Sequence, residues 1–546
     1  MSPMAMLEMP SRRCLIWPVY WILSLLALVF LAPSCSRDRE QPQNFILMTL
    51  DTQRADFLGA YASDTQTPNL DSLARSGIVY ENCYCLIPTT LPSHANMLFS
   101  EEPHRLQVFN NGQVVQADDR RPSFVQVFKS QGYTTAAFLS LGVLKKRHGL
   151  SEGFDVYQDE FPQGRFYLTA QELNRNLLPW IEKHQDEPFF LWVHYSDPHE
   201  PYYPPDSPKE MKVFLNDTQI SEISLNKSLN HLELELKEGE NRLRFEIPRP
   251  YVRDRRKKVA LFDRFSPGKI EKEQDVTLDF RKGWHKQGNQ KFYGVSRTAI
   301  LDVHNPQGPR KIDFSFRGKI IVPLQYKRGR YQSEVEYMDK HIGDLLQSLK
   351  GLGLFDRTHL LVIGDHGEGL GEYPRWDGKP HYGHTHYLQG VYMHVPLIIR
   401  PAALEGDPRR VKDVVTTLDV APTIMHMMGF RELRHFQGAS LIDLPPGTNR
   451  KVFQQAHRPL AHKDTFALLH YPWHIIFTPV DKAYELYDLS RDPGETQNLY
   501  EESLAEPVRS LKAELDAFTR KVLNEKIDPQ FDKQSQRMLK ALGYIK

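Results

Sequence analysis

The sequence predicts an α/β fold, with a mostly parallel sheet flanked by helices, and three observations support it. Short apolar runs end abruptly at polar residues, as buried parallel strands do. Helical patterns separate these runs, and strands that alternate with helices are typical of parallel sheets. In the middle of the 546-residue chain this alternation stops and a period-two pattern replaces it, which predicts an inserted antiparallel β-sandwich.

The elements of the α/β part follow in chain order. The first strand is Phe45–Leu50, a continuous apolar run that stops at Asp51. Four further strands have the same character: Thr135–Leu139, Phe189–His194, His359–Ile363 and Val395–Ile399. Helices are predicted between the strands at Asn69–Ser76, Leu168–His184 and Tyr331–Leu352.

The insertion is predicted over residues 206–324. It contains alternating stretches such as Leu232–Leu236 and Arg242–Ile247, separated by Asn, Gly and Pro. The charged run Arg253–Lys258 could bind an anionic polymer, but a solvated loop is the commoner explanation. After Lys451, short strand-like pieces and a helix near residues 505–521 predict a small C-terminal α+β subdomain.

The N-terminus has the pattern of an export signal. Arg12 and Arg13 precede the apolar run Cys14–Ala32, and charged residues then resume. The segment Leu31–Cys35 resembles a bacterial lipobox, in which Cys35 would be lipidated. The alternative is an uncleaved signal anchor, because the run is about long enough to cross a ~30 Å hydrocarbon core. Either way, we expect export and anchoring to the membrane through the N-terminus, at the periplasmic or outer surface of a bacterial cell envelope.

The predicted organisation therefore has six parts. They are a signal or anchor (1–35), a linker (36–42), the first part of the α/β domain (43–205), the insertion (206–324), the second part of the α/β domain (325–450) and the C-terminal subdomain (451–546).

Composition narrows the function classes. The chain has 69 Lys+Arg and 68 Asp+Glu, so its net charge of +1 gives no reason to expect nucleic acid as a partner. With 40% hydrophobic and 25% charged residues it is an ordinary globular chain. Its four cysteines exclude a disulfide scaffold. Cys83 and Cys85 are two apart in a strand-like segment, so no disulfide is expected between them. The 22 histidines are the unusual feature.

Acidic residues and histidines gather at the predicted strand ends. They are Asp51, Asp197, His199, Asp365, His366, His384 and His386. The carboxyl ends of parallel strands meet at one edge of a sheet, where such groups can form a divalent metal site. A single Asp at such a position is more often a turn or helix-cap residue, so the signal is the whole set.

A candidate nucleophile lies in the segment Ile87–Leu98. Pro92 and Ser93 read as the start of a helix, with Thr90 just before it. A hydroxyl there would face free backbone N–H groups and the positive end of the helix dipole, which stabilise an alkoxide. Taken alone, the segment is an ordinary helix start.

In order along the chain, several motifs resemble the sulfatase branch of the alkaline phosphatase superfamily. The resemblance covers residues 43–205 and 325–500, and the ordered set is specific where each motif alone is weak. The motifs are Leu50–Asp56, Thr67–Ala74, Asp197–Tyr202, Gly364–Glu368, His394–Ile398 and Tyr484–Glu495. The resemblance implies an alkaline-phosphatase-like fold and a metal-dependent ester hydrolase.

The resemblance also implies roles for individual residues. Asp51, Asp365 and His366 match ligands of the family's main metal, and Thr90 falls at the nucleophile position. His199 matches a histidine that contacts the substrate anion or a second metal.

Two further assignments follow from the resemblance. His384 falls near a basic or histidine ligand position, and Asp197 is a candidate ligand of a second metal.

Three departures from the family pattern refine this expectation. Sulfatases convert a Cys or Ser in a Cys-x-Pro-Ser-Arg motif to formylglycine, whereas Thr90 cannot form that aldehyde. His94 replaces the motif's Arg, and we expect it to contact the substrate. Thr52 stands where the family has a second acidic residue, which favours zinc or manganese over calcium, as one or two ions.

A threonine nucleophile with such ions resembles the superfamily's nucleotide pyrophosphatase/phosphodiesterases and phosphoethanolamine transferases. We therefore expect an exported hydrolase that cleaves a phosphate mono- or diester through a covalent Thr90 intermediate, with catalytic help from His199. Three alternatives stay open. They are a sulfuric ester hydrolase without formylglycine, a phospho-group transferase acting on a glycan or lipid, and a non-catalytic surface binding protein.

Overall fold

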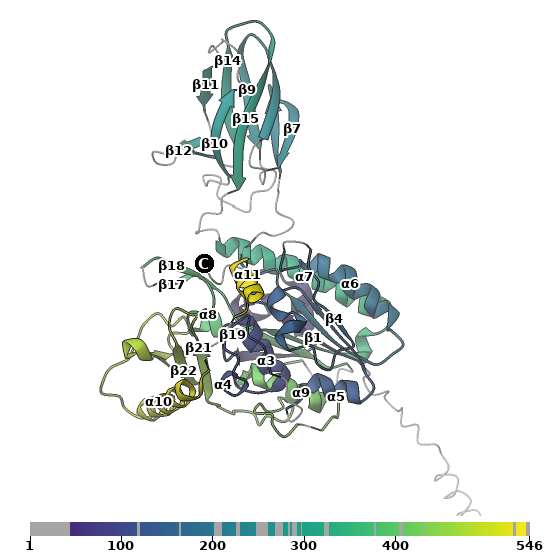
Figure 1. The fold of residues 1–546 in the computed structure, drawn as a ribbon, viewed down its shortest axis with the longest axis vertical. Coiled ribbons are helices and arrows are strands. Elements are labelled where there is room, and N and C mark those ends of the chain that lie inside the picture. Colours follow the sequence, from purple (N-terminus) through teal and green to yellow (C-terminus); the bar gives the residue numbers. More distant parts are fainter. Residues whose placement is uncertain are drawn as a thin grey trace, which may run out of the picture.

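The computed structural model describes most of the chain after residue 43 (Figure 1). The described residues are 44–116, 121–162, 165–200, 202, 210–224, 230–246, 260–267, 277–281, 284–286, 292–295, 298–320, 327–375, 378–402, 408–431, 433–527 and 531–541. The predicted export signal, Cys35 and the run Arg253–Lys258 lie outside them. Across the described part of the chain, no helix has the length and apolar character needed to cross a membrane.

An eight-stranded sheet forms the centre of the α/β domain, in the order β20-β2-β19-β16-β1-β5-β3-β4. All five predicted strands are present, each within one residue of its predicted ends, whereas β2, β4 and β20 were not predicted. The bounds are β1 Asn44–Leu50, β2 Ile78–Tyr84, β3 Thr134–Leu139, β4 Val156–Gln158, β5 Phe189–Tyr195, β16 Thr358–Gly364, β19 His394–Arg400 and β20 Arg409–Thr416.

Strand direction decides which loops reach the functional edge. β1 pairs in parallel with β5 and β16, so the carboxyl ends of these three strands meet. β19 is antiparallel to β16, with Ile363 opposite Leu397 and Leu360 opposite Arg400. The amino end of β19 therefore lies at that same edge, and it is the loop before β19 that reaches the site.

Helices cover both faces of the sheet. Phe45 and Leu47 of β1 pack on one face with α3 (Thr90–Phe99), α5 (Phe124–Ser130) and α9 (Val420–Met427). Ile46 and Met48 face α2 (Pro68–Arg75), α6 (Ala170–Lys183) and α7 (Lys327–Gly351) on the other. Burial on both faces explains why β1 reads as an unbroken apolar run rather than an alternating one. Shorter helices are α4 (Pro103–Leu106) and α8 (Gly390–Met393).

The insertion contains two five-stranded antiparallel sheets, in the orders β12-β13-β10-β15-β8 and β11-β14-β9-β6-β7. Its core includes Val213, Leu234, Leu243 and Phe245, the inward positions of the alternating pattern. The strands are β6 Glu210–Leu215, β7 Thr218–Ser224, β8 Asn230–Leu236, β9 Gly239–Glu246, β10 Ala260–Pro267, β11 Thr277–Phe280, β12 Trp284–Lys286, β13 Phe292–Val295, β14 Thr298–Asn305 and β15 Arg310–Ile320.

The C-terminal subdomain has the predicted α+β composition. Helix α10 packs on a four-stranded antiparallel sheet, through Leu511 and Leu515 among others. Its elements are β21 Val452–Ala456, β22 Thr465–His470, β23 Trp473–Thr478, β24 Ala483–Asp488 and α10 Val508–Glu525. The last helix, α11 Lys533–Ala541, packs instead on the core of the α/β domain through Met538 and Leu539. A two-stranded ribbon, β17 (Gly369–Pro374) and β18 (Pro380–Gly383), follows the β16 loop. Cys83 and Cys85 are both free and buried, as expected.

Candidate metal centre and nucleophile

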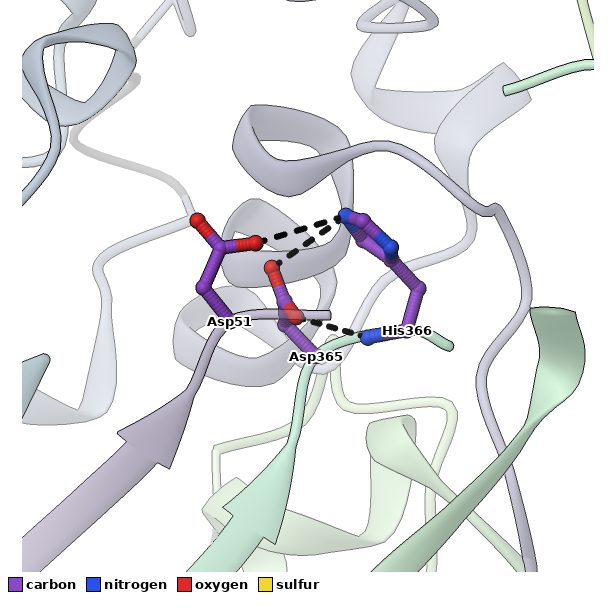
Figure 2. A group of neighbouring side chains, drawn as sticks. All are labelled: Asp51, Asp365 and His366. Atoms are coloured by element: carbon purple, nitrogen blue, oxygen red, sulfur yellow. Dashed lines mark hydrogen bonds and ion pairs between the residues drawn. The ribbon is translucent and has the colours of Figure 1, made fainter. Parts of the chain in front are cut away.

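Asp51, Asp365 and His366 form a buried cluster at the carboxyl ends of β1 and β16 (Figure 2). One ligand atom from each lies within 4.8 Å of the others. The Nε2 atom of His366 is 3.9 Å from Asp51 Oδ1 and 3.4 Å from Asp365 Oδ2. The strand register produces this arrangement, because Leu50 and Gly364 are paired and each is followed by an aspartate. The structure thus brings together the three residues predicted as ligands of the main metal.

The carboxylates of this cluster have unmet bonding capacity. Asp365 Oδ1 accepts hydrogen bonds from the backbone N–H groups of Thr52 (2.9 Å) and His366 (2.8 Å). Asp365 Oδ2 and both oxygens of Asp51 are buried without a hydrogen-bond partner. Burial raises the pKa of Asp51, and burial together with the neighbouring Asp51 raises the pKa of Asp365 to about 7. Two unpartnered buried carboxylates are costly unless a cation compensates them, so the residues fit a divalent metal.

His366 has the form that a metal ligand needs. Burial lowers the pKa of His366 to about 4, which keeps the imidazole neutral. Its Nδ1 lies 3.0 Å from the carbonyl oxygen of Gly367 and donates there, so the Nε2 lone pair points toward the carboxylates. Two carboxylates and one imidazole are a donor set suited to zinc or manganese.

Thr90 is the fourth member of the site. Its Oγ1 lies 3.3 Å from His366 Nε2, and the side chain is buried. Ser93 Oγ donates to the carbonyl oxygen of Asp365 at 2.7 Å, which ties α3 to the β16 loop.

The start of α3 differs from the prediction. The helix begins at Thr90 itself, with Thr89 as the N-cap, rather than at Pro92. The N–H of Leu91 donates to Asn111 Oδ1 and that of Ser93 to the Thr89 carbonyl, and proline has none. The prediction of free backbone N–H groups is therefore wrong at these positions, because Leu91 and Ser93 already donate to other groups of the protein and Pro92 has no N–H.

His94 lies one turn after Thr90 on α3. Its ring packs against Trp192, with centroids 5.4 Å apart, and its Nδ1 is 2.8 Å from the Thr90 carbonyl oxygen. The same Nδ1 is 3.8 Å from Asp365 Oδ2, and the residue is 1% exposed. These contacts make His94 a support for Thr90 and Asp365. Its Nε2 is buried without a hydrogen-bond partner, and its predicted contact with substrate stays a prediction.

His194 was not predicted as a site residue, although it ended a predicted strand. Its Nε2 lies 3.5 Å from Asp51 Oδ2, and its Nδ1 is 3.0 Å from Thr49 Oγ1. That hydroxyl also accepts the indole N–H of Trp192 at 2.9 Å, and it can donate its own proton to His194 Nδ1. We assign the ring proton of His194 to Nε2, where it faces Asp51.

His384 lies beside His366, and His199 lies beside His384. The ring centroid of His384 is 4.5 Å from that of His366 and 5.2 Å from that of His199. His384 Nδ1 is 2.7 Å from Glu368 Oε2, and Tyr202 donates its hydroxyl to Glu368 Oε1. His384 lies outside the three-residue ligand group, although it was predicted as a metal ligand. Glu368 belongs to the Asp-His-Gly-Glu motif but was not predicted to orient His384.

Asp197 is separated from this cluster, and its predicted role as a metal ligand is corrected. Its two oxygens lie 3.0 and 3.2 Å from the backbone nitrogen of Ala170, the first residue of α6. Burial raises the pKa of Asp197 to about 7. A carboxyl group in this position holds the start of a helix rather than a metal.

Thr52 offers no ligand in place of the missing acidic residue. Its hydroxyl donates to the carbonyl oxygen of Asp51 at 2.7 Å, and its φ of 55° lies in the left-handed region. The Tyr331 hydroxyl donates to the Thr52 carbonyl at 2.6 Å and so holds this turn. In this strained turn the backbone N–H of Thr52 donates to Asp365. No side-chain oxygen of Thr52 is directed to the metal position.

Comparison with known proteins places most of the chain in one family. A family model described as Sulfatase matches residues 43–430, and one described as N-sulphoglucosamine sulphohydrolase, C-terminal, matches residues 382–521. The N-acetylglucosamine-6-O-sulfatase of Bacteroides thetaiotaomicron is 23% identical, over 88% of this chain and 87% of that protein. The choline-sulfatase of Rhizobium meliloti is 23% identical, over 82% of this chain and 78% of that protein.

Solved structures share the fold. One was determined in complex with its substrate D-glucosamine-2-N,6-O-disulfate and has a TM-score of 0.58 at 17% identity, over 89% of this chain and 99% of that one. The phosphonate monoester hydrolase of Agrobacterium radiobacter has a TM-score of 0.55 at 17% identity, over 88% of this chain and 95% of that one. This likeness confirms the predicted alkaline-phosphatase-like fold.

Proposed function

The chain belongs to the sulfatase family of hydrolases, and from that premise we propose that it cleaves a phosphate mono- or diester through a covalent intermediate on Thr90. One observation carries the proposal: a threonine hydroxyl lies 3.3 Å from His366 Nε2, beside two buried carboxylates with unpartnered oxygens. A threonine cannot become formylglycine, so Thr90 acts as an unmodified alcohol nucleophile.

Asp51, Asp365 and His366 would hold one divalent ion, with zinc or manganese favoured over calcium. When bound, such an ion supplies positive charge that favours the ionised hydroxyl and the charged transition state. The Thr90 oxygen attacks phosphorus in line with the leaving group, and the bond to the leaving ester oxygen breaks. Water then attacks the phosphorus, breaks its bond to the Thr90 oxygen and restores the Thr90 hydroxyl. It releases phosphate when the substrate is a monoester and a phosphate monoester when the substrate is a diester.

His199 and His384 border the position of the reacting ester. Glu368 holds His384 through Nδ1 and so directs its other ring nitrogen away from the carboxylate. We assign these two imidazoles to the non-bridging and leaving oxygens of the ester. Because His384 Nδ1 donates to Glu368 and His199 Nδ1 donates to the Glu200 carbonyl oxygen, each ring presents an N–H donor at Nε2 to a developing negative charge only in its protonated form.

A second candidate function is hydrolysis of a sulfuric ester at the same Thr90. It is favoured by the relatives, since N-acetylglucosamine-6-O-sulfatase and choline-sulfatase both match most of the chain. The two candidates share every residue of the site and differ only in the central atom that Thr90 attacks. Transfer to a glycan or lipid acceptor, and a binding protein without turnover, are the remaining alternatives.

A metal-supplemented assay separates these functions. The purified protein is assayed with 4-nitrophenyl phosphate, bis(4-nitrophenyl) phosphate and 4-nitrophenyl sulfate, with Thr90→Ala as the control. We expect kcat/KM for one of the phosphate esters to exceed that for the sulfate by about tenfold or more. Dominant hydrolysis of the sulfate would select the second candidate. Low hydrolysis with a labelled acceptor would indicate a transferase, and no turnover with any ester would favour the binding protein.

We also propose that the protein is exported and anchored at the cell envelope through its N-terminus. The proposal rests on the basic pair, the apolar run and the lipobox-like segment that ends at Cys35. Incorporation of labelled fatty acid in a bacterial host, lost in Cys35→Ala, is the expected result. Membrane attachment without label would favour the signal anchor.

A further inference from the structure

Glu495 is a buried carboxylate of the C-terminal subdomain that the proposed chemistry does not use. Its side chain is 1% exposed, and its backbone φ of 51° lies in the left-handed region, which is uncommon for residues other than glycine. A buried carboxylate on a strained backbone persists only where the surrounding contacts hold it. These contacts lead from the subdomain to both halves of the candidate site.

One oxygen of Glu495 holds α8, the short helix before β19. Glu495 Oε2 accepts the backbone N–H of Gly390, the first residue of α8. A Cβ atom at Gly390 would lie 3.2 Å from that oxygen, so glycine leaves room for the approach. In the same turn, the carbonyl oxygen of Gly494 accepts the hydroxyl of Tyr373 on β17 at 2.8 Å. The turn that contains Glu495 is thus bonded to the α/β domain at two places.

Helix α8 in turn holds the loop that follows His366. The carbonyl oxygen of Tyr392 accepts the backbone N–H of Gly367 at 2.7 Å. The carbonyl oxygen of Val391 accepts the backbone N–H of Glu368 at 3.0 Å. A Cβ atom at Gly367 would lie 2.1 Å from the Val391 carbonyl oxygen, so the loop and the helix are in direct contact. Because Gly367 also accepts the Nδ1 proton of His366, the position of α8 helps to orient this imidazole.

The other oxygen of Glu495 leads to the segment before the nucleophile. Glu495 Oε1 is 2.5 Å from His474 Nδ1, and His474 Nε2 is 3.1 Å from Gln454 Oε1. The amide nitrogen of Gln454 donates to the Cys85 carbonyl oxygen at 3.2 Å. The backbone N–H of Cys85 donates to the carbonyl oxygen of Met393, the last residue of α8, at 2.9 Å. Both routes from Glu495 therefore meet at Cys85.

The hydrogen-bond directions explain how a carboxylate is tolerated here. Since the Gln454 nitrogen donates to Cys85, its oxygen faces His474 Nε2, while Glu495 faces Nδ1. Both ring nitrogens thus face oxygen acceptors, an arrangement that the doubly protonated imidazole satisfies. We assign this form to His474, whose positive charge compensates the buried carboxylate.

We propose that Glu495 is a positioning residue for the reaction at Thr90. Through Gly390 it fixes α8, and α8 fixes both the loop after His366 and the segment before the nucleophile. The C-terminal subdomain accordingly contributes to catalysis without touching the substrate, because it keeps the metal ligands and the nucleophile in register. This inference rests on the proposed function in taking Thr90 as the nucleophile, and it holds for a phosphate or a sulfate ester alike.

Two substitutions of Glu495 test the inference. Glu495→Ala removes both acceptors. Glu495→Gln keeps an oxygen for the Gly390 N–H, and its amide can donate to Nδ1 of a neutral His474, so the link to α8 survives. Asp488→Ala is the matched control, because Asp488 is a buried carboxylate of the same subdomain that accepts hydrogen bonds from Ser490 in its own turn.

Three measurements on the full chain compare these variants with the parent. Hydrogen exchange read by mass spectrometry reports on the peptide that contains Gly367 and Glu368. Competition with a chromophoric chelator gives the affinity for zinc, and ester turnover at saturating zinc gives kcat and KM. We expect Glu495→Ala to speed exchange in that peptide, to weaken zinc binding by about tenfold or more, and to lower kcat by about tenfold with KM within about twofold. Glu495→Gln should stay within about threefold of the parent in each measurement.

The control and a second variant separate positioning from folding. Asp488→Ala should lower Tm but leave the exchange, zinc affinity and kcat unchanged. Gly390→Pro breaks the same hydrogen bond from the other side with a residue that the first position of a helix accepts, and it should reproduce the changes seen in Glu495→Ala.

The inference is overturned if Glu495→Ala lowers only Tm, if Glu495→Gln loses as much as Glu495→Ala, or if Gly390→Pro behaves as the parent does. Failure of the proposed function has a different signature: ester turnover survives Thr90→Ala, while Glu495→Ala still weakens zinc binding and speeds exchange.

Discussion

The hydroxyl oxygen of Thr90 lies 3.3 Å from Nε2 of His366, where the first turn of α3 meets the carboxyl ends of β1 and β16. Both side chains are fully buried, and His366 is held by the Gly367 carbonyl on its far side. The proposed nucleophile and one proposed metal ligand are thus held by separate elements that meet at this edge of the sheet. The predictions below follow from this relationship.

Replacing Thr90 by Ala and by Ser distinguishes a role as nucleophile from a purely structural role of this residue. Thr90→Ala should lower kcat/KM by on the order of 10³-fold or more, because the attacking oxygen is removed. Thr90→Ser keeps the oxygen and should retain measurable activity. Elemental analysis should find the same metal content in both variants, since Asp51, Asp365 and His366 are unchanged in each. Equal activity in Ala and Ser variants would show that the hydroxyl is not the nucleophile.

Metal removal should lower both activity and thermal stability. Chelation leaves Asp51 and Asp365 as neighbouring buried carboxyl groups, and a ligand that binds only the folded state raises Tm. Zinc or manganese should restore Tm and turnover, and calcium should do so less well. Asp51→Asn is the matched control: it should not respond to metal, and its metal-free Tm should exceed that of the parent. A chelated protein with unchanged Tm and activity would contradict the metal site.

His194 is expected to position Asp51 for the metal. Replacing it by Phe removes the N–H that faces Asp51 Oδ2 and should weaken metal binding by about 10–100-fold. His194→Gln keeps a donor near the Nε2 position and should lose less. Activity at saturating metal should recover in both variants, as measured by metal titration of turnover. A loss of kcat that metal does not restore would assign His194 to the chemistry instead.

Asp197 should make the stability of the protein depend on pH. Its folded pKa of about 7 lies above the ordinary value of 3.8 for an aspartate, so the folded protein keeps this proton to higher pH than the unfolded chain. The stabilisation is complete below about pH 4 and is lost as pH rises through 7. The difference in unfolding free energy between parent and Asp197→Asn should therefore fall by on the order of 4 kcal/mol over that range, measured by urea denaturation.

The same variant checks the corrected role of Asp197. Because its oxygens bond to the start of α6, Asp197→Asn should leave the metal content unchanged. A lower metal content in Asp197→Asn would show that Asp197 is a metal ligand.

Patterns of burial determined how much of the fold could be predicted. β1, β5 and β16 are buried on both faces, so each reads as an apolar run. β2 was missed because Glu81 and Asn82 interrupt its apolar pattern. The antiparallel direction of β19 could not be predicted either, because an apolar run does not indicate in which direction its strand lies in the sheet.

The site residues could be predicted from the sequence where a motif contains a residue type that has a single role in the family. Asp51, Asp365 and His366 follow strand ends and match family positions, and the structure brings them together. Asp197 also follows a strand end, but its carboxyl group is hydrogen-bonded to the backbone N–H at the start of α6. His194 was missed because its role depends on lateral register, in which it lies opposite Thr49 on β1. Sequence order does not contain that information.

The most direct test of a covalent phospho-threonine is to trap it. The metal-loaded protein is mixed with 4-nitrophenyl phosphate, quenched in acid within the first turnover, digested and analysed by mass spectrometry. We expect one phosphoryl group on the peptide that contains Thr90, and none in Thr90→Ala. Release of phosphate while that peptide stays unmodified, or its sulfation by 4-nitrophenyl sulfate without phosphorylation, would contradict the account.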